Sequence, residues 1–548
     1  MNMKQRGHKL SGFLKILLTV LLIFLVYWVE LPPMNPRSPQ FWTFLVFVGA
    51  ICLIVNFFSA IRDFFYTLPR SDLRTAGAGF KGLGKPVKFF LGFLAFVVVL
   101  LMFGNLIGAP FFHASRYKSL ISVETGDFTQ DVAEIKMSQI PVVDRDTASR
   151  LGRRKLGEMS DLVSQFEIEE DFTQINYQGT PYRVTPLIYG DPVKWLYNRS
   201  QGLPAYITVN MVTQETTLVR MESGIKYSRG EYFFRNIYRH LRFHYPTKIF
   251  DEISFEIDEE GTPYWVAPTI RYRIGLWSGK DIGGAVLVNA VTGECAYYDV
   301  KDIPSWVDQV YLSDLVVEQM NYYGKFQNGF INSVIGQRGV LQTTAGYNYL
   351  AIGDDVWLYT GMTSVMSDES NTGFILANLR TKETKYYVVP GAEEFSAMES
   401  AQGQVQHLNY VSTFPLLLNV SNRPTYFMSL KDAAGLVKMY AFVDVEQYQV
   451  VGTGVTVDEA RADYASKFTG EDIEIQPEES GEIQGKIAAI SSAVVDGNTV
   501  YYFMLEDSDM VYTAGISVSQ HLPFYKAGDQ VKVGYTELAG VRQVIWVE

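Results

Sequence analysis

The chain has 548 residues, of which 47% are hydrophobic and 19% charged, and this length predicts about two to four domains. Its two cysteines, Cys52 and Cys295, exclude a disulfide scaffold and a cysteine-rich zinc site. The net charge of −12 is uneven: residues 1–118 hold 13 Lys or Arg and three acids, whereas the rest hold 34 basic and 56 acidic residues. The acidic remainder argues against nucleic acid as a partner, because binding needs cations that displace phosphate counterions.

Three apolar runs within residues 13–112 predict three transmembrane helices. They are Phe13–Val29, Phe41–Ile61 and Phe89–Phe112. Each has roughly the 20 residues that cross about 30 Å of hydrocarbon. No Ala-x-Ala cleavage site follows the first run, so we expect it to be retained rather than removed as a signal peptide, although cleavage stays open.

The basic residues near these runs predict the topology. Lys4, Arg6 and Lys9 lie in the tail of residues 1–12, and six Lys or Arg lie between the second and third runs. The loop between the first two runs has only Arg37. The positive-inside rule then places the N-terminus in the cytoplasm and residues 113–548 outside. We therefore expect a multi-pass protein of the cell membrane whose first partner is the lipid bilayer.

A pair of small residues, Gly104 and Gly108, ends the third run. Such a spacing lets two membrane helices approach closely, although glycine near a helix end can also be incidental. The runs carry no central Asp, Glu, Lys or His, which argues against a transporter.

Residues 113–165 are expected to form a helical neck, and residues 166–470 then repeat. Three segments share a strand, Asn, two residues, Thr, one residue, Glu and a second strand: Ile207–Val219, Val286–Tyr298 and Ile375–Tyr387. This pattern predicts β-hairpins with a polar turn. Met439–Val451 is a degenerate fourth copy.

Helices are expected between the hairpins. Ser228 with Glu231 and Thr456 with Glu459 match a capping box, and Ser305 with Asp308 resembles one. A further helical stretch follows Pro390. A helix on one face of a short antiparallel sheet is an α+β unit.

The hairpin at Val288, Thr292, Gly293 and Glu294 resembles the V-x-x-x-T-G-E hairpin of the PepSY domain, while the other copies depart from it. Stretches 181–209 and 430–445 are similar to multi-pass membrane proteins of Firmicutes-type bacteria. This resemblance implies PepSY-like repeats outside the membrane that bind or inhibit, often near peptidases or the cell wall.

The C-terminal part begins with an acidic linker, residues 471–482, and continues with five short strand candidates in residues 483–548. This arrangement predicts a small all-β barrel of the OB type. Tyr501, Tyr502 and Phe503 form a possible ligand platform, or else one side of their strand is core. The acidity of this part favours a sugar or peptide over a polyanion.

The search for chemistry finds no nucleophile elbow, H-E-x-x-H motif or P-loop. His240 and His244 lie one helical turn apart and could bind zinc, but no third ligand can be named. We expect packed histidines here. Arg235, Arg239, Arg242 and Lys248 surround them and are expected to pair with acids of a neighbouring unit, or to bind an anionic wall polymer. The acidic stretch 251–260 could coordinate calcium, but its spacing is not that of an EF-hand loop, and we expect a polar strand face with a turn.

These observations predict three transmembrane helices, an α+β extracytoplasmic region and an OB-like barrel. The expected function is non-catalytic: a membrane-anchored binding or scaffolding protein of the cell envelope, with an envelope protein or cell-wall polymer as partner. No catalytic residue, metal or cofactor is expected. The alternatives are a metal-assisted envelope hydrolase that uses His240 and His244, and a receptor or accessory subunit of a membrane complex.

Overall fold

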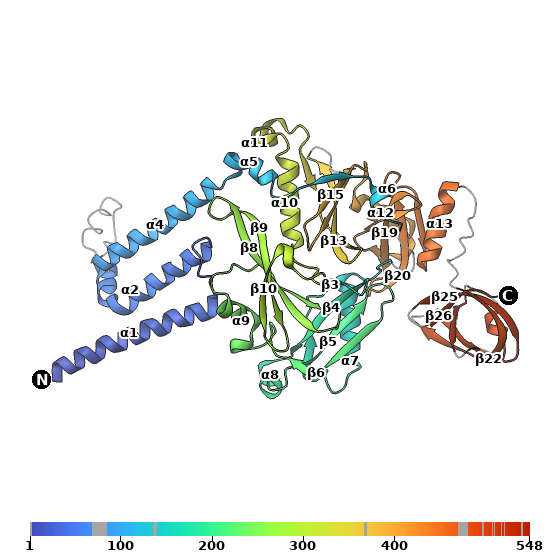
Figure 1. Cartoon of the computed structure of the whole chain (residues 1–548), viewed down its shortest axis with the longest axis horizontal. Helices are drawn as coiled ribbons and strands as arrows, with labels where there is room; N and C mark the ends of the chain where they lie inside the picture. Colours follow the sequence, from blue (N-terminus) through green and yellow to red (C-terminus); the bar gives the residue numbers. More distant parts are fainter. Residues whose placement is uncertain are drawn as a thin grey trace. The chain divides into compact units, whose positions relative to one another are not determined.

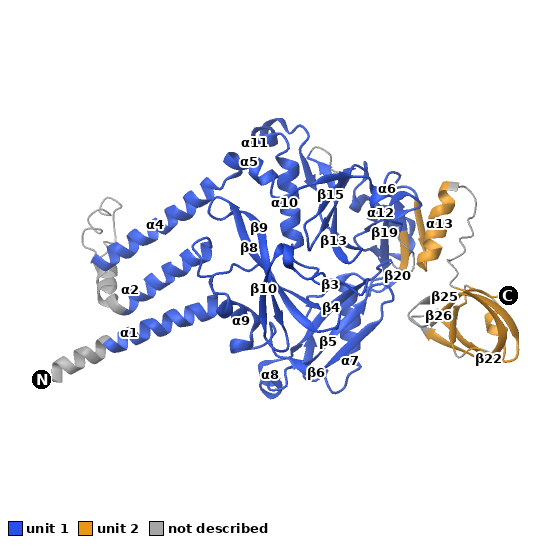
Figure 2. Ribbon diagram, viewed as in Figure 1, with its two compact units in different colours: residues 1–438, 442–450 blue, residues 439–441, 451–548 orange. Residues whose placement is uncertain are grey.

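The computed structural model describes residues 3–67, 85–134, 140–365, 370–469, 481–495 and 498–547, apart from positions 507, 509, 517, 520, 539 and 540. The chain divides into two compact units (Figure 2). Unit 1 comprises residues 1–438 and 442–450, and unit 2 comprises residues 439–441 and 451–548.

Unit 1 begins with the helices α1 (Met3–Glu30), α2 (Pro39–Thr67) and α4 (Lys85–Ile107). Two stretches are long and apolar enough to cross a membrane, Phe13–Glu30 and Lys85–Ile107. The prediction of three transmembrane helices is therefore wrong. The apolar stretch described in α2, Pro39–Val55, is shorter than either of these two.

The three helices pack side by side, with α2 between α1 and α4 (Figure 1). The ring of Tyr27 on α1 lies 5.9 Å from that of Phe44 on α2. On the other side of α2, the ring of Trp42 lies 6.2 Å from that of Phe96 on α4. The C-terminal ends of α1 and α4 thus point toward the same β-rich part of unit 1.

Residues that were expected to form a neck lie within unit 1 and pack on its sheets. They include α5 (Pro110–Lys118), β1 (Glu124–Gly126) and α6 (Phe128–Asp131). Strand β1 pairs in parallel with β15 (Thr384–Tyr387), so the chain joins a distant sheet soon after leaving α4.

Helices and antiparallel sheets alternate in the rest of unit 1. The first repeat contains α7 (Arg145–Gly157), β2 (Phe166–Ile168), β3 (Thr173–Tyr177), β4 (Thr180–Tyr189), α8 (Pro192–Asn198), β5 (Leu203–Asn210) and β6 (Thr216–Ile225). The second contains η3 (Phe233–Arg235), α9 (Ile237–His244), β7 (Ser254–Ile257), β8 (Pro263–Ile274), β9 (Ser278–Asn289), β10 (Cys295–Asp299) and η4 (Val300–Asp302). Their sheets have the orders β2-β4-β5-β6, with β3 on β4, and β10-β9-β8-β7.

Two further repeats follow the same plan. The third contains α10 (Ser313–Lys325), α11 (Gly329–Ile331), η5 (Asn332–Gly336), β11 (Leu341–Thr343), β12 (Asn348–Ile352), β13 (Asp355–Ser364), β14 (Ser370–Asn378) and β15. The fourth contains β16 (Gly391–Ala392), α12 (Glu394–Gln404), η6 (Gln406–Leu408), β17 (Val411–Ser412), β18 (Leu416–Val420), β19 (Arg423–Lys431) and β20 (Val437–Asp444). The core between the second and third repeats includes Val266, Leu287, Val316 and Leu358.

The repeated Asn-x-x-Thr-x-Glu segments form tight hairpin turns. In each, the Asn side-chain Oδ1 accepts two backbone N–H bonds of 2.8–3.0 Å; these residues are Asn210, Asn289 and Asn378. The position before Glu is left-handed, with φ of +63°, +79° and +67° at Gln214, Gly293 and Lys382. Side-chain caps and a left-handed residue are what such a turn requires, so the motif encodes the hairpin locally.

A tertiary contact fixes each helix to the hairpin turn of its own repeat. In each repeat, two consecutive residues before the helix donate backbone N–H hydrogen bonds to one carbonyl. That carbonyl belongs to the residue that directly follows the Asn of the turn, which is Met211, Ala290 or Leu379. The N–H of the same residue donates to the carbonyl of Pro181, Pro263 or Val356 near the start of an inner strand. This arrangement recurs in three repeats and holds their helices in equivalent places.

The helix starts differ in part from the predicted capping boxes. Helix α9 begins at Ile237 and is capped by Asn236, not by Ser228. Glu231 is buried instead and accepts hydrogen bonds from the Tyr189 hydroxyl (2.6 Å) and Trp195 Nε1 (2.7 Å). Helix α10 begins at Ser313, well after the predicted Ser305 box.

In unit 2, the predicted box that opens α13 (Val457–Thr469) is confirmed. The N–H of Glu459 donates to Thr456 Oγ1 over 3.2 Å, and the N–H of Thr456 donates to a Glu459 carboxylate oxygen over 3.4 Å. These bonds lie within four residues, which is why the sequence alone reveals them. Strand β21 (Val451–Gly454) packs against α13.

Unit 2 ends in the closed barrel expected from the strand candidates. Its strand order is β22-β23-β24-β26-β25, with β25 pairing back to β22. The elements are β22 (Gly481–Val495), β23 (Asn498–Leu505), β24 (Val511–Gly515), η7 (Leu522–Phe524), β25 (Gln530–Leu538) and β26 (Val541–Val547). Its core includes Ile487, Tyr512 and Val533.

Candidate functional site

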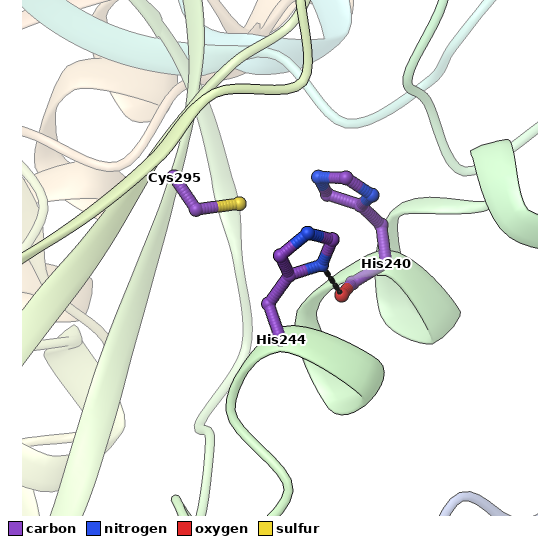
Figure 3. Close-up of side chains that lie close together, drawn as sticks. All are labelled: His240, His244 and Cys295. Atoms are coloured by element: carbon purple, nitrogen blue, oxygen red, sulfur yellow. Dashed lines mark hydrogen bonds between the residues drawn. The ribbon is translucent and has the colours of Figure 1, made fainter.

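The structure brings a cysteine to the predicted histidine pair. His240 and His244 lie one turn apart on α9, and Cys295 is the first residue of β10 (Figure 3). One ligand atom from each of the three residues lies within 4.8 Å of the others. In the close-up, the sulfur of Cys295 points toward the imidazole rings. Two imidazoles and a thiol form a group that could bind a metal ion.

Hydrogen bonds define which ring nitrogens are free. His240 Nε2 lies 2.7 Å from the carbonyl of Gly293, and His244 Nδ1 lies 2.9 Å from the carbonyl of His240. A carbonyl only accepts, so both nitrogens carry the proton, and Nδ1 of His240 and Nε2 of His244 retain their lone pairs. Metal-binding histidines usually donate their second nitrogen to a carbonyl or carboxylate in this manner.

Burial favours the uncharged forms of His240 and Cys295. Burial lowers the pKa of His240, and the nearby His244 lowers it further. Burial raises the pKa of Cys295 to about 11, and the Glu294 carboxylate adds to the increase. A metal ion would therefore displace the thiol proton on binding. Imidazole and thiolate ligands favour soft or borderline ions such as Zn²⁺ or Cu⁺.

The sequence named no third ligand because Cys295 lies far along the chain from α9. Cys295 directly follows the Thr-Gly-Glu turn and begins a strand. The sequence could have indicated it as a third ligand only if the strand after this turn had been predicted to lie beside the helix. His240 is also packed, as expected, with its ring 4.4 Å from that of Tyr227. Packing and metal binding use different atoms of the same ring.

Gly104 and Gly108 allow a close approach of α4, but its partner there is the second repeat and not another apolar helix. A Cβ on Gly104 would lie 2.0 Å from the Trp277 ring, and one on Gly108 would lie 2.2 Å from Ser278 Oγ. Trp277 lies in the turn between β8 and β9, and Ser278 is the first residue of β9. The glycines therefore seat the end of α4 against the second repeat.

The proposed aromatic platform of the barrel is split between two faces. Phe503 is only 2% exposed and stacks on Tyr512 with ring centres 5.6 Å apart. Tyr501 is half-buried and packs on the same core. Because successive strand residues face opposite sides, only Tyr502 points away from the core. Phe503 is a core residue, and a continuous platform of the three side chains is excluded.

The arginines of α9 bind backbone carbonyls rather than the expected acids. Arg242 Nε donates to the carbonyl of Leu31 over 2.9 Å, and its Nη1 donates to that of Lys248 over 2.6 Å. Arg239 Nε donates to the carbonyl of Trp28 over 3.4 Å. Two of these carbonyls belong to the C-terminal end of α1 and the residue that follows it, so the arginines of α9 hold the end of α1.

Comparison with known proteins identifies no family. No family model matches the chain, and no curated protein matches it. Among solved structures, a levansucrase mutant from B. megaterium is 10% identical with a TM-score of 0.18, covering 78% of this chain and 96% of its own. An exo-1,5-alpha-L-arabinanase from a bovine ruminal metagenomic library is 10% identical with a TM-score of 0.16, covering 69% and 97%. Likenesses this distant carry no argument about this chain.

Proposed function

We propose that the chain is a membrane-anchored, non-catalytic binding or scaffolding protein of the cell envelope, with its repeats and barrel outside the cytoplasm. The observation that carries the proposal is the attachment of two apolar helices to the second repeat. An anchor fastened at two points holds the repeats close to the bilayer and restricts their orientation. The expected partner is an envelope protein or a cell-wall polymer.

The attachment of α1 consists of backbone and guanidinium contacts. Besides the Arg242 bond to Leu31, the N–H of Met34 donates to the carbonyl of Pro246 over 2.7 Å. Asn35 Nδ2 donates to the carbonyl of Thr247 over 2.9 Å. These bonds hold the segment that directly follows α1. Tyr27 and Trp28 at the end of α1 itself pack against Phe243 with ring centres 5.8 Å apart in each pair, and a cleaved signal peptide would not make such contacts in the mature fold, so they support retention of α1.

The attachment of α4 combines close packing with one buried hydrogen bond. The Trp277 ring lies against Gly104, where any side chain would collide with it. The hydroxyl of Tyr117, on α5, donates to the carbonyl of Gly108 over 2.7 Å. Trp277 is 8% exposed, which marks this junction as packed rather than incidental.

The surfaces of the helices suit lipid contact. Only 6% of the apolar window of α1 and 11% of that of α4 is buried. Large apolar side chains such as Phe13, Phe89 and Met102 are 67–80% exposed. Core helices of a soluble protein would bury such side chains, so a hydrocarbon environment explains them better.

Aromatic and basic side chains gather where α1 meets the second repeat. Trp28 packs against Phe234 and Phe243 with ring centres 4.9 and 5.8 Å apart, and the Arg239 guanidinium lies 5.0 Å from the Trp28 ring. Phe234 is 61% exposed. Aromatic rings and cations at a helix end are typical of the membrane–water interface. With the basic N-terminal tail in the cytoplasm, this interface faces outward.

Labelling with a membrane-impermeant maleimide tests the topology. In a cysteine-free background, Glu399→Cys, at an exposed position of α12, should react in intact cells, whereas Gln5→Cys should react only after lysis. The reverse pattern would overturn the outward placement. Co-sedimentation of the detergent-solubilised full chain with purified cell walls then tests the polymer partner, and crosslinking in whole cells tests a protein partner. A chain that binds neither contradicts the scaffolding role.

The His240, His244 and Cys295 group supports a second candidate, a metal-dependent envelope protein. Three protein ligands with an open fourth position are typical of catalytic zinc sites. A hydrolase would additionally need a general base, and the three residues supply none once they bind the ion. Metal content and hydrolytic activity of the purified chain separate a metal-stabilised scaffold from an enzyme.

A further inference from the structure

A polar cavity of about 280 Å³ lies where the first three repeats meet. Its walls come from β3, β4, the segment before β7, β9, the start of α10 and the region of β12. Ligand pockets usually measure about 300–1,000 Å³, so this cavity suits a small molecule. Its lining includes three basic and four acidic side chains, Arg145, Arg183, Lys280, Asp171, Asp251, Glu252 and Asp314.

Arg183 is a buried cation without a counterion in this lining. Its side chain is among the buried charged groups, at 6% exposure. Its Nη2 donates to Gln174 Oε1 over 3.3 Å, whereas its Nε has no hydrogen-bond partner. Among the described residues it forms no ion pair. Burial lowers its pKa to about 10, which reflects the cost of holding this charge away from water.

The other two cations of the lining are neutralised. Arg145 pairs with Asp171 over 2.7 Å, and Lys280 pairs with Asp251 over 2.7 Å. Arg183 is therefore the basic group of the pocket that remains available to a ligand. A guanidinium binds a carboxylate or phosphate through two parallel hydrogen bonds.

Two more donors lie beside this guanidinium. Gln174, which is 2% exposed and pairs with Arg183 across β3 and β4, has no partner for its Nε2. Helix α10 begins in the pocket wall, and Leu312 at its N-cap provides no side-chain cap. Uncapped amides at a helix start carry partial positive charge. All three features favour an anionic group.

The acids of the lining determine which anion fits. Glu252 and Asp314 form no ion pair among the described residues, so the pocket offers negative charge as well as the guanidinium. Both would repel a phosphate dianion but would attract an ammonium group. We propose that this pocket binds a small zwitterion of the amino-acid or short-peptide type, with its carboxylate on Arg183 and its ammonium facing Glu252 and Asp314.

This inference goes beyond the proposed function and does not depend on it. It rests on the lining residues, which are the same on either side of a membrane. The labelling and sedimentation experiments can therefore fail without affecting it.

Calorimetric titration and thermal unfolding of the detergent-solubilised full chain test the pocket. The probes are glycine, L-alanine, D-alanine and alanyl-alanine, with acetate and inorganic phosphate at equal ionic strength as comparison anions. At least one zwitterion should bind and raise the unfolding midpoint more than acetate or phosphate does. Absence of binding by every zwitterion, or preferential binding of phosphate, would overturn the proposal.

Variants tie the binding to the named residues. Arg183→Met should weaken zwitterion binding at least about tenfold and should raise the unfolding midpoint without ligand, since it removes an uncompensated buried charge. Asp314→Asn should weaken binding of the zwitterion but not of acetate. Arg220→Met, which removes an exposed arginine paired with Asp161, is the matched control and should leave both affinities unchanged. Unaltered zwitterion affinity in Arg183→Met contradicts the assignment.

Discussion

The backbone N–H of Asp308 donates to Oε2 of Glu256 over 2.8 Å, deep within the junction of the first three repeats. Glu256 also accepts from Gln309 N over 3.1 Å. Asp308 in turn accepts from the N–H groups of Asn176, in the first repeat, and Val356, in the third, over 2.7 and 3.2 Å. Two buried carboxyl groups therefore join three repeats through backbone donors.

This carboxyl pair should make stability depend on pH. Burial raises the pKa of Glu256 to about 7, and burial together with the Glu256 charge raises the pKa of Asp308. A raised pKa means that the folded state holds the proton more tightly than the unfolded state. The associated stabilisation is complete below the ordinary carboxyl pKa and is lost as pH rises through about 7.

Denaturant unfolding of the full chain in detergent at several pH values measures this effect. The free energy of unfolding should fall by about 2–3 kcal/mol between mildly acidic and mildly alkaline conditions. Glu256→Gln, which carries no titrating proton, should flatten the profile. An equally steep profile in that variant would show that other groups cause the dependence.

The left-handed turn positions predict opposite effects of the same substitution. Gln214→Gly should stabilise the fold by about 0.5–1 kcal/mol, because glycine adopts a positive φ without strain. Lys382→Gly gains the same relief but loses the bonds from Nζ to Asp281 (2.7 Å) and to the carbonyl of Leu120 (2.6 Å). We expect a net loss of about 1–2 kcal/mol there.

Thermal unfolding of the two variants provides the comparison. Gly293→Ala is a third variant for this comparison. It should destabilise the folded protein, because the added Cβ would lie 2.3 Å from the Tyr227 ring. Equal effects of glycine at positions 214 and 382 would contradict a structural role for the Lys382 side chain.

Arg242 should control how firmly α1 is attached. Arg242→Met keeps an apolar stem but leaves the carbonyls of Leu31 and Lys248 without this donor, at a cost of about 2–3 kcal/mol. The segment between α1 and α2 contains Arg37 as its tryptic site. Trypsin should cut there at least about tenfold faster in the variant, since local opening becomes easier.

Arg235→Met is the matched control for this experiment. Arg235 lies in the same basic cluster but donates to the carbonyl of Arg199, within the repeats. Cleavage at Arg37 should be unchanged in this variant. Equal acceleration in both variants would point to general destabilisation instead.

The histidine and cysteine group predicts a bound metal ion. The full chain, purified without chelator, should carry close to one Zn²⁺ or Cu⁺ per molecule, and Cys295→Ser or His244→Ala should reduce this content at least about tenfold. The affinity of the protein for the metal ion should fall as pH falls, because protons compete with the ion for His240 and His244.

Elemental analysis and a competing chelator measure the metal content. Cys52→Ser, which removes the cysteine on α2, is the control and should retain the metal. A metal-free wild type that takes up no added Zn²⁺ would leave only the packing role of the histidines.

Local patterns made part of the fold predictable. The Asn210, Asn289 and Asn378 turns and the Thr456 box use hydrogen bonds between residues two or three positions apart, so the motif and the structure coincide. The barrel was foreseen from alternating strands. The prediction of three transmembrane helices was wrong, because the apolar stretch described in α2, Pro39–Val55, is shorter than the other two.

The amino-acid sequence by itself determined the apolar helices, the charge asymmetry, the repeated hairpins and the histidine pair, because each depends on neighbours along the chain. Only the tertiary structure decided that Cys295 faces those histidines, that Arg242 reaches a carbonyl 211 residues away, and that Arg183 is buried without a counterion. For Arg242 the physical reason is that every residue has a backbone carbonyl, so the sequence does not indicate which carbonyl will accept the hydrogen bond. Burial, likewise, depends on which distant surfaces cover a side chain.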